Sequence, residues 1–183
     1  IGQQKTIDEV KKSGLNGRGG AAFPTAIKMQ TVLDQESKTK YVACNADEGD
    51  GGTFSDRLIM ECDPYSLIEG MTIAAYSVGA NHGYIYLRSE YPLAKYFLTE
   101  AIKILKSHNL LGKNILGKNF TFDIELRIGA GSYVCGEETA MMESIEGKRG
   151  LVRSKPPLPA IKGLFSKPTL INNVITLASM SAI

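Results

Sequence analysis

The loop GLNGRGGAAFPTAIK, residues 14–28, combines glycines with two cations and so is the first place where chemistry could occur. Gly17 and Gly19 begin a nominal match to the dinucleotide-binding pattern GxGxx[GA]. That pattern normally follows a strand, whereas the segment before this loop has helical spacing. Glycines let the backbone approach a ligand closely, and Arg18 and Lys28 could attract an anion. The loop therefore predicts either an anion-binding site or a glycine-dependent turn between two helices.

A second polar segment, NADEGDGGTFSDR, follows the apolar run YVACN. Its ligand-type side chains are Asn45, Asp47, Glu48 and Asp50. A calcium loop of the EF-hand type is excluded, because the sixth position counted from Asn45 is Asp50, where that turn requires glycine. Polar groups at the carboxyl end of a strand are typical of ligand sites in α/β sheets. We therefore expect this segment to contribute to a binding site.

Helix capping accounts for some of the polar residues. Thr53 and Asp56 form a capping-box pattern before the helical segment SDRLIME, a cap that does not need the acidic residues preceding it. In GSYVCGEET, Glu137 and Glu138 begin a predicted short helix that ends at Gly147. The helix dipole favours carboxylates there by roughly 0.3–1 kcal/mol, and neighbouring helix residues diverge, so a shared proton is not expected. Capping and ligand binding both stay open for this pair.

The cysteines do not form a metal site. Cys44, Cys62 and Cys135 lie far apart in the sequence, whereas a zinc or iron-sulfur centre needs about four ligands at short spacings. His82 and His108 have no partners at ligand spacing. We therefore predict no metal ligands in this sequence, with the cysteines reduced and in or near a core.

Composition excludes several broad classes of protein. The 183 residues are 43% hydrophobic, which suits one domain with a sizeable core, expected over residues 1–183. The net charge of +2 without a long basic run argues against nucleic acid binding. Apolar stretches are interrupted before about 18 residues and no signal peptide is visible, so we expect a cytoplasmic location without membrane insertion. The apolar helical pattern at the end suggests that the sequence is part of a longer one.

Predicted strands and helices alternate along the chain. Strands are expected at residues 41–45, 82–88 and 122–128, and helices at residues 6–14, 24–34, 63–80, 91–108, 137–146 and 169–180. The proline-rich residues 154–168 are expected to be irregular. Strand, long helix, strand is the rhythm of an α/β fold with helices packed on the faces of a sheet.

Five segments in this order resemble a known family. They are GLNGRGGAAFPTAIK, NADEGDGGTFSDR, IEGMTIAAYSVGA, GAGSYVCGEETAMMESIEGKRG and KPPLPAIKGLFSKPTLINNVITLA. Together they resemble the FMN-binding, NADH-oxidising flavoprotein subunit of respiratory complex I and its relatives in NAD(P)-linked hydrogenases and formate dehydrogenases. The resemblance covers essentially the whole chain. It implies a Rossmann-like, three-layer α/β/α domain that binds FMN and oxidises NADH or NADPH.

The resemblance also implies roles for individual residues. The positions expected to bind the cofactors are Gly17, Arg18, Gly19, Phe23, Lys28, Asn45, Asp47, Glu48, Asp50, Tyr133, Gly136, Glu137, Glu138, Lys155, Asn172 and Asn173. Among these, Phe23 and Lys155 correspond to NADH contacts, and the two asparagines near the end of the chain to contacts with the ribityl phosphate. Glu48 and Glu138 are expected to be the catalytic residues.

Four positions depart from the family pattern, mostly on the nucleotide side. Thr31 and Leu158 stand where the family has phenylalanine, Met29 where it has tryptophan, and Asp50 where it has glutamate. Each lost aromatic stack is worth roughly 0.5–1.5 kcal/mol beyond area burial, so adenine binding is expected to be weaker. The alternatives are an NADPH-specific hydrogenase subunit, a ferredoxin-linked variant, and a degenerate flavin domain that serves only as a scaffold.

The resemblance implies partners as well. Family members continue into a ubiquitin-like domain and a helical domain whose cysteines hold a 4Fe–4S cluster, and they dock a thioredoxin-like 2Fe–2S subunit. In these proteins FMN would pass single electrons to the clusters within a multisubunit redox complex, and a position peripheral to a membrane complex is one expectation for this domain. Without those domains, this chain is expected to show diaphorase activity at most, with a soluble dye as the acceptor.

Overall fold

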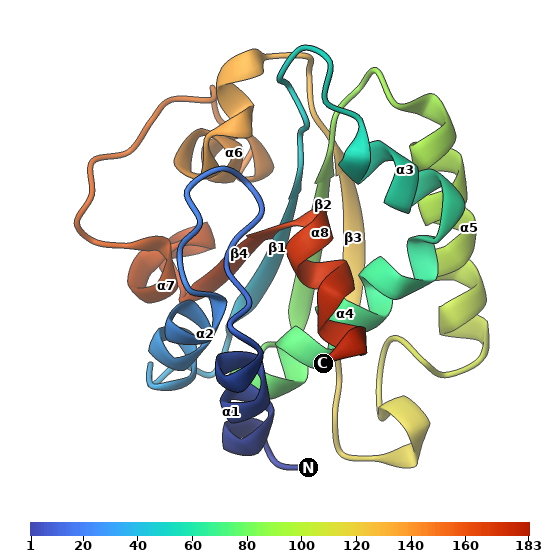
Figure 1. Cartoon of the computed structure of the whole chain (residues 1–183), viewed down its shortest axis with the longest axis vertical. Coiled ribbons are helices and arrows are strands. Elements are labelled where there is room, and N and C mark those ends of the chain that lie inside the picture. The colour runs from blue at the N-terminus through green and yellow to red at the C-terminus, as the bar shows by residue number, and fades with distance from the viewer.

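A four-stranded parallel sheet forms the centre of the computed structural model, which describes residues 1–183 (Figure 1). Its strands are β1 (Tyr41–Ala46), β2 (His82–Leu87), β3 (Asp123–Ile128) and β4 (Thr169–Asn173). They lie in the order β3-β2-β1-β4, and every neighbouring pair is parallel. The three strands predicted from the sequence and the α/β fold class are confirmed.

The direction in which strands are added reverses at β1. The chain places β2 and then β3 on one side of β1, and returns to place β4 on the other side. The register sets Asn45 opposite Asn173 and Cys44 opposite Asn172. The carboxyl ends of β1 and β4 therefore lie side by side at the switch point of the sheet, where open α/β sheets bind their ligands.

The expectation of a single helix over residues 169–180 is wrong. Residues 169–173 form β4, and α8 (Val174–Ala178) and the 3₁₀ turn η4 (Ser179–Ala182) follow. The helix begins where the Asn173 side chain accepts hydrogen bonds from the backbone N–H groups of Ile175, at 2.8 Å, and Thr176, at 3.4 Å. Four of the five β4 residues are buried, and no glycine or proline separates the strand from the largely buried α8, so the sequence does not mark where the strand ends.

One face of the sheet carries the larger hydrophobic core. Its helices are α1 (Gln3–Ser13), α2 (Thr25–Leu33), α3 (Ser55–Cys62), α4 (Pro64–Val78) and α5 (Pro92–Ser107), together with α8. They contribute to a cluster of 32 buried residues. The α4 and α8 backbones approach closely, since a Cβ on Gly70 would lie 1.8 Å from the carbonyl oxygen of Leu177. Only glycine fits at this crossing.

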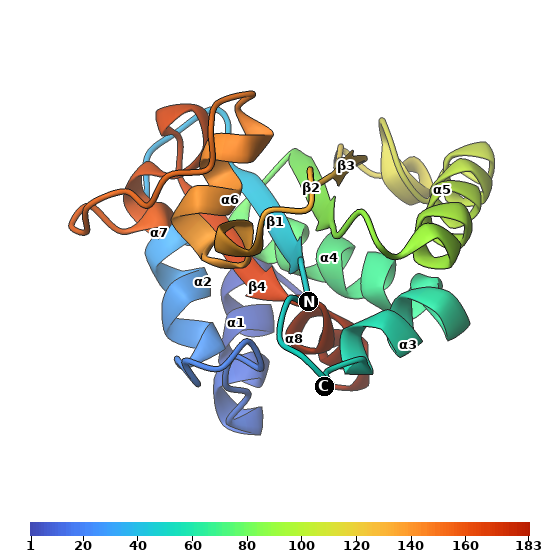
Figure 2. The same cartoon turned by 90° about the horizontal axis from the view of Figure 1, so that it is seen from above.

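The opposite face is covered by shorter elements. These are α6 (Glu138–Ile145) and α7 (Pro159–Lys162), with the 3₁₀ turns η2 (Tyr133–Gly136) and η3 (Leu164–Ser166), while η1 (Ile115–Gly117) precedes β3. Seen from above, α4 and α8 lie on one side of the strands and α6 on the other (Figure 2). A second cluster of eight buried residues joins α6 to the sheet, so the fold has three layers. The segment expected to be irregular contains α7 and η3. No helix combines the length and apolar composition needed to cross a lipid bilayer.

Candidate functional site

Two adjoining cavities open at the carboxyl ends of β1 and β4. The lysine cavity, of about 440 Å³, contains Lys28 and Lys155. The acidic cavity, of about 640 Å³, is lined by acidic side chains from the loop after β1 and from α3. The cation Arg18 lines it as well. The residues that line both cavities are Gly19, Asn45, Gly136, Glu137 and Asn173. The two spaces therefore form one elongated site at the switch point of the sheet.

The structure brings together every residue that the sequence singled out for cofactor binding. The lysine cavity is lined by Gly17, Gly19, Phe23, Lys28, Asn45, Gly136, Glu137, Glu138, Lys155, Asn172 and Asn173. The acidic cavity adds Arg18, Asp47, Glu48, Asp50 and Tyr133. The glycine-rich loop does connect two helices, α1 and α2, as its context predicts, and it also forms one wall of the site.

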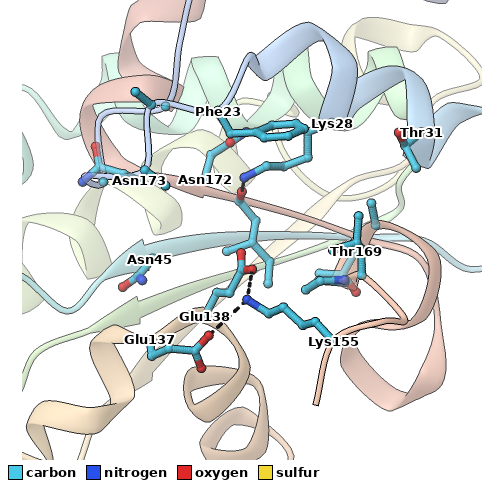
Figure 3. A pocket seen from close by; sticks show the side chains of 18 of the residues that line it. Phe23, Lys28, Thr31, Asn45, Glu137, Glu138, Lys155, Thr169, Asn172 and Asn173 are labelled. Carbon is cyan, nitrogen blue, oxygen red and sulfur yellow. Dashed lines mark hydrogen bonds and ion pairs between the residues drawn. The ribbon is translucent and has the colours of Figure 1, made fainter. Parts of the chain in front are cut away.

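Lys28 places a half-buried positive charge on one side of the lysine cavity. Its ammonium donates a hydrogen bond to the backbone oxygen of Ile171 in β4, at 2.7 Å (Figure 3). Burial lowers the pKa of Lys28, an effect that the negative charge of Glu138 opposes. A second cation, Lys155, lowers this pKa further. A bound anion would relieve the cost of holding both positive charges in the cavity.

Facing Lys28 across the cavity, Lys155 bridges the two adjacent glutamates at the start of α6 (Figure 3). Its ammonium lies 3.2 Å from Glu137 Oε1 and 2.6 Å from Glu138 Oε1. Burial lowers the pKa of Lys155, but the hydrogen bond and charge of Glu138, followed by those of Glu137, outweigh this and raise it. Glu137 also caps α6, because its carboxylate accepts the backbone N–H groups of Thr139 and Ala140. The capping interpretation is confirmed for Glu137, while Glu138 is held by its ion pair.

The Glu48 carboxylate is committed to protein donors. Its Oε1 accepts the backbone N–H of Asp56 at 3.1 Å, and its Oε2 accepts the backbone N–H of Arg57 at 3.2 Å and the hydroxyl of Tyr91 at 3.0 Å. The backbone oxygen of Glu48 also accepts a hydrogen bond from the Arg88 guanidinium. Glu48 is only 8% exposed, so it acts as an internal support for the wall of the acidic cavity.

The capping box predicted for Thr53 and Asp56 is therefore wrong. Helix α3 begins at Ser55 after Phe54, and neither Phe54 nor Thr53 caps it with a side chain. Glu48 takes this role from a distance of eight residues along the chain, which satisfies N–H groups that a local cap would have bound. The expectation that the cap leaves Glu48 free is also wrong, while Asn45 and Asp47 are not used by it.

The remaining residues of the acidic cavity fix the loops around it. Asn45 donates to the backbone oxygen of Gly136 at 2.8 Å, which ties the end of β1 to η2. The hydroxyl of Tyr133 donates to Asp50 at 2.8 Å, and its ring covers Gly49, where a Cβ would come within 3.0 Å of it. Burial raises the pKa of Asp47. The hydrogen bonds of Asn45 and Tyr133 therefore connect β1 and the loop after it to η2 beside the acidic cavity.

Sequence reasoning missed Asp56 as a residue of the site. This carboxyl is 5% exposed, lines the acidic cavity, and accepts a 2.6 Å hydrogen bond from Asn173 on Oδ2. Its Oδ1 is buried without a hydrogen-bond partner. Burial, followed by the charge of Glu48, raises the pKa of Asp56 to about 7. The pattern that could have identified it, an acid in a helical first turn, was explained by capping instead.

The buried donors of the lysine cavity fit a ligand rich in hydrogen-bond acceptors. Asn172 is 4% exposed, and its side-chain nitrogen has no hydrogen-bond partner. An unsatisfied buried amide costs roughly 1–3 kcal/mol, which an acceptor on a ligand would recover. FMN, the cofactor that the resemblance implies, would supply such acceptors through its phosphate, hydroxyl and carbonyl oxygens. No group of His, Cys, Asp and Glu side chains is arranged to hold a metal ion, and all three cysteines are free.

An open parallel sheet with a glycine-lined cleft at its switch point is typical of α/β proteins that bind nucleotides or flavins. The family model described as the Nuo51 FMN-binding domain matches residues 10–182. The chain belongs to this family.

Relatives of known name support the assignment over nearly the whole chain. The F subunit of NADH-quinone oxidoreductase from Aquifex aeolicus is 53% identical over 97% of this chain. The HndC subunit of the NADP-reducing hydrogenase from Solidesulfovibrio fructosivorans is 52% identical over 98% of it. The chain spans only 41% and 36% of the lengths of these two proteins. The solved NAD⁺-reducing [NiFe]-hydrogenase in its H₂-reduced state superposes with a TM-score of 0.90, at 39% identity over 98% of this chain and 30% of that one.

Proposed function

We propose that this domain binds one FMN in the joined lysine and acidic cavities and accepts hydride on it from NADH or NADPH. The observation that carries the proposal is the unpartnered amide nitrogen of Asn172, buried beside the Lys28 ammonium in a cavity at the sheet's switch point. FMN supplies the chemistry when bound, since it accepts two electrons as hydride and releases them one at a time. The protein supplies binding, orientation and charge.

The residues of the two cavities divide these tasks. Lys28 and Asn172 would hold acceptor oxygens of the flavin, and Lys155 would attract the phosphates of the nucleotide. Glu138 is bound through one carboxylate oxygen to Lys155, and its other oxygen has no protein hydrogen bond. We therefore keep Glu138 as the candidate catalytic residue that can contact a ligand. Glu48 would act as a positioning residue, because protein donors occupy its carboxylate.

The electron acceptor would be supplied by other parts of a multisubunit redox complex. Relatives are named as subunits of NADH-quinone oxidoreductase and of NAD(P)-reducing hydrogenases. The three free cysteines of this chain hold no metal centre. We propose that electrons leave through iron-sulfur clusters of a further domain and of a thioredoxin-like partner subunit. On its own the domain would reduce soluble dyes such as ferricyanide.

The test is anaerobic mixing of the FMN-loaded domain with NADH and, separately, with NADPH. Stopped-flow absorbance follows bleaching of the bound flavin. Bleaching by either nucleotide supports the proposal, and the faster donor defines the preference, which the NADP-linked relative leaves open. A loaded domain that neither nucleotide bleaches would act as a scaffold instead.

We predict that Phe23→Ala selectively weakens use of the nucleotide. Phe23 is 46% exposed on the wall of the lysine cavity, so its ring is available to stack on a ligand. Removing one such stack should raise the NADH concentration for half-maximal bleaching by about 2- to 12-fold. The dissociation constant of FMN should change little. Equal loss of both would mean that Phe23 only supports the loop.

A further inference from the structure

Two carboxyl groups that line the acidic cavity, those of Glu48 and Asp56, differ in the number of hydrogen bonds they accept. Glu48 accepts hydrogen bonds from two backbone N–H groups and from the Tyr91 hydroxyl. Asp56 accepts one side-chain hydrogen bond, from Asn173, and its Oδ1 is buried without a partner. The backbone N–H of Ile175 also favours the charged form of Asp56, but less than burial and the charge of Glu48 disfavour it. Hydrogen bonds to a carboxylate favour its charged form, and a neighbouring charge disfavours a second one. Burial, followed by the charge of Glu48, therefore favours the protonated form of Asp56.

The position of that proton is fixed by the chain around it. The Asn173 side-chain oxygen accepts N–H groups at the start of α8, so the nitrogen of this amide must face Asp56 Oδ2. Oδ2 accepts, which leaves Oδ1 as the oxygen that carries the proton. A proton can bind there without disturbing the hydrogen bond that connects α3 to the end of β4.

No cation packed against Asp56 replaces this proton. The thiol of Cys44 in β1 is neutral, because burial raises its pKa well above the usual range. The phenol of Tyr91 is neutral as well, since burial and its bond to Glu48 raise its pKa to about 12. The charge of Arg57 is paired with Glu61, because its Nε lies 2.9 Å from Glu61 Oε1.

Helices α4, α5 and α8 pack against α3. The lysines of α5, Lys95, Lys103 and Lys106, are all exposed. Helix α8 contains no titratable residue, and Glu69, the one charged residue of α4, is exposed.

Arg88, which follows β2, donates to the backbone oxygen of Glu48 and lies over the Tyr91 ring. Arg18 lines the acidic cavity together with the carboxyls of Asp47, Asp50 and Glu137, and its backbone N–H donates to Thr176 of α8. The charge of Arg88 lowers the pKa of Asp47, but no cation acts on Asp56 in this way, so its negative charge is balanced by a proton.

We propose that Asp56 is a positioning residue that takes up a proton when an anionic flavin enters the site. The proposal rests on the proposed binding of FMN. A negatively charged ligand in the acidic cavity, which Asp56 lines, would repel the Asp56 carboxylate. One proton from solvent would then form an O–H bond at Oδ1, and nothing is oxidised or reduced. The neutral acid keeps its bond to Asn173, whose side chain lines both cavities. Asp56 thus couples flavin affinity to pH.

The sign of the pH dependence follows from the free site. The pKa of Asp56 near 7 means that the group is mostly protonated below this pH and must gain a proton above it in order to bind an anion. FMN affinity should therefore fall as pH rises from about 6 to about 8.5, by about tenfold for each unit by which the bound anion raises this pKa. The phosphate of FMN has its own titration, which is common to every variant compared.

The test is the FMN dissociation constant against pH for the wild type, Asp56→Asn and Glu61→Gln. Asparagine can accept from Asn173 and donate from the position of the protonated oxygen, so Asp56→Asn should bind with a pH slope shallower than that of the wild type. Glu61 lies on the same helix, paired with Arg57, and Glu61→Gln should keep the wild-type slope. Identical slopes for the wild type and Asp56→Asn would overturn the inference, whereas absence of FMN binding at every pH in all three would overturn the proposed function.

A second measurement uses the wild type alone, in case Asp56→Asn does not fold. Calorimetric titration with FMN near pH 7.5 in two buffers of different ionisation enthalpy counts the protons exchanged. Net uptake of a fraction of a proton per FMN is expected. No exchange, or net release, would contradict the role of Asp56.

Discussion

Gly19→Leu should abolish FMN binding while leaving the fold intact. Gly19 lines both cavities, so a side chain there occupies the space that joins them. The substitution is tolerated locally, because the backbone of Gly19 is not in the left-handed region and a Cβ would lie 3.4 Å from the Asn173 Cβ. We expect at least about a 100-fold loss of affinity, equivalent to about 2.7 kcal/mol, measured by quenching of FMN fluorescence.

Gly51→Leu is the matched control for this substitution. Gly51 lies in the exposed loop after β1, its backbone is also outside the left-handed region, and nothing lies within 4 Å of an added Cβ. This variant should bind FMN as the wild type does. Circular dichroism of both variants separates a blocked cavity from a lost fold. Folded Gly19→Leu with an affinity within about threefold of the wild type would rule out these cavities as the flavin site.

Lys28→Met should be the next most damaging change for FMN. Methionine keeps most of the volume of the stem but removes the half-buried charge whose ammonium binds the Ile171 carbonyl. A hydrogen bond to a charged group contributes about 1.5–3 kcal/mol, so FMN should bind about 10- to 100-fold more weakly. Riboflavin, which lacks the phosphate, should be affected less. Titrations with both ligands measure the difference.

The control for Lys28→Met is Lys103→Met, on the exposed face of α5. The Lys103 ammonium makes only a long ion pair, 3.9 Å from Glu100 Oε2, and Lys103 lines neither cavity. Its replacement changes the net charge of the protein by the same amount. FMN affinity should not change, and an equal loss in both variants would mean that overall charge, not the site, governs binding.

Periodicity identified the elements that obey a simple pattern. Strands β1 and β2 are short runs rich in Val, Ile and Tyr, β3 alternates apolar and polar residues, and α4 and α5 have helical spacing over several turns. β4 was missed because five extended residues run directly into a buried helix, without a glycine or proline between them. A short buried strand and a buried helix segment cannot be separated by periodicity alone. The pairing of β4 with β1 decides the structure there, and pairing is a long-range property.

That missed strand also explains why residue patterns alone did not assemble the site. Asn45 and Asn172 are separated by more than half of the chain, and only β4 brings them to one edge of the sheet. The resemblance to the family supplied the grouping that spacing could not. Local rules failed again at Glu48, where a distant carboxylate caps α3 in place of Thr53. In both cases, backbone groups find their hydrogen-bond partners in residues that are distant in the sequence.

The proposal that the joined cavities at the carboxyl ends of β1 and β4 hold one FMN is tested most directly by titrating FMN with this domain. Quenching of flavin fluorescence follows the binding. Saturable quenching is expected at micromolar protein, with an end point of one FMN per chain. Quenching that does not saturate, or that saturates equally with Gly19→Leu, would contradict the proposal.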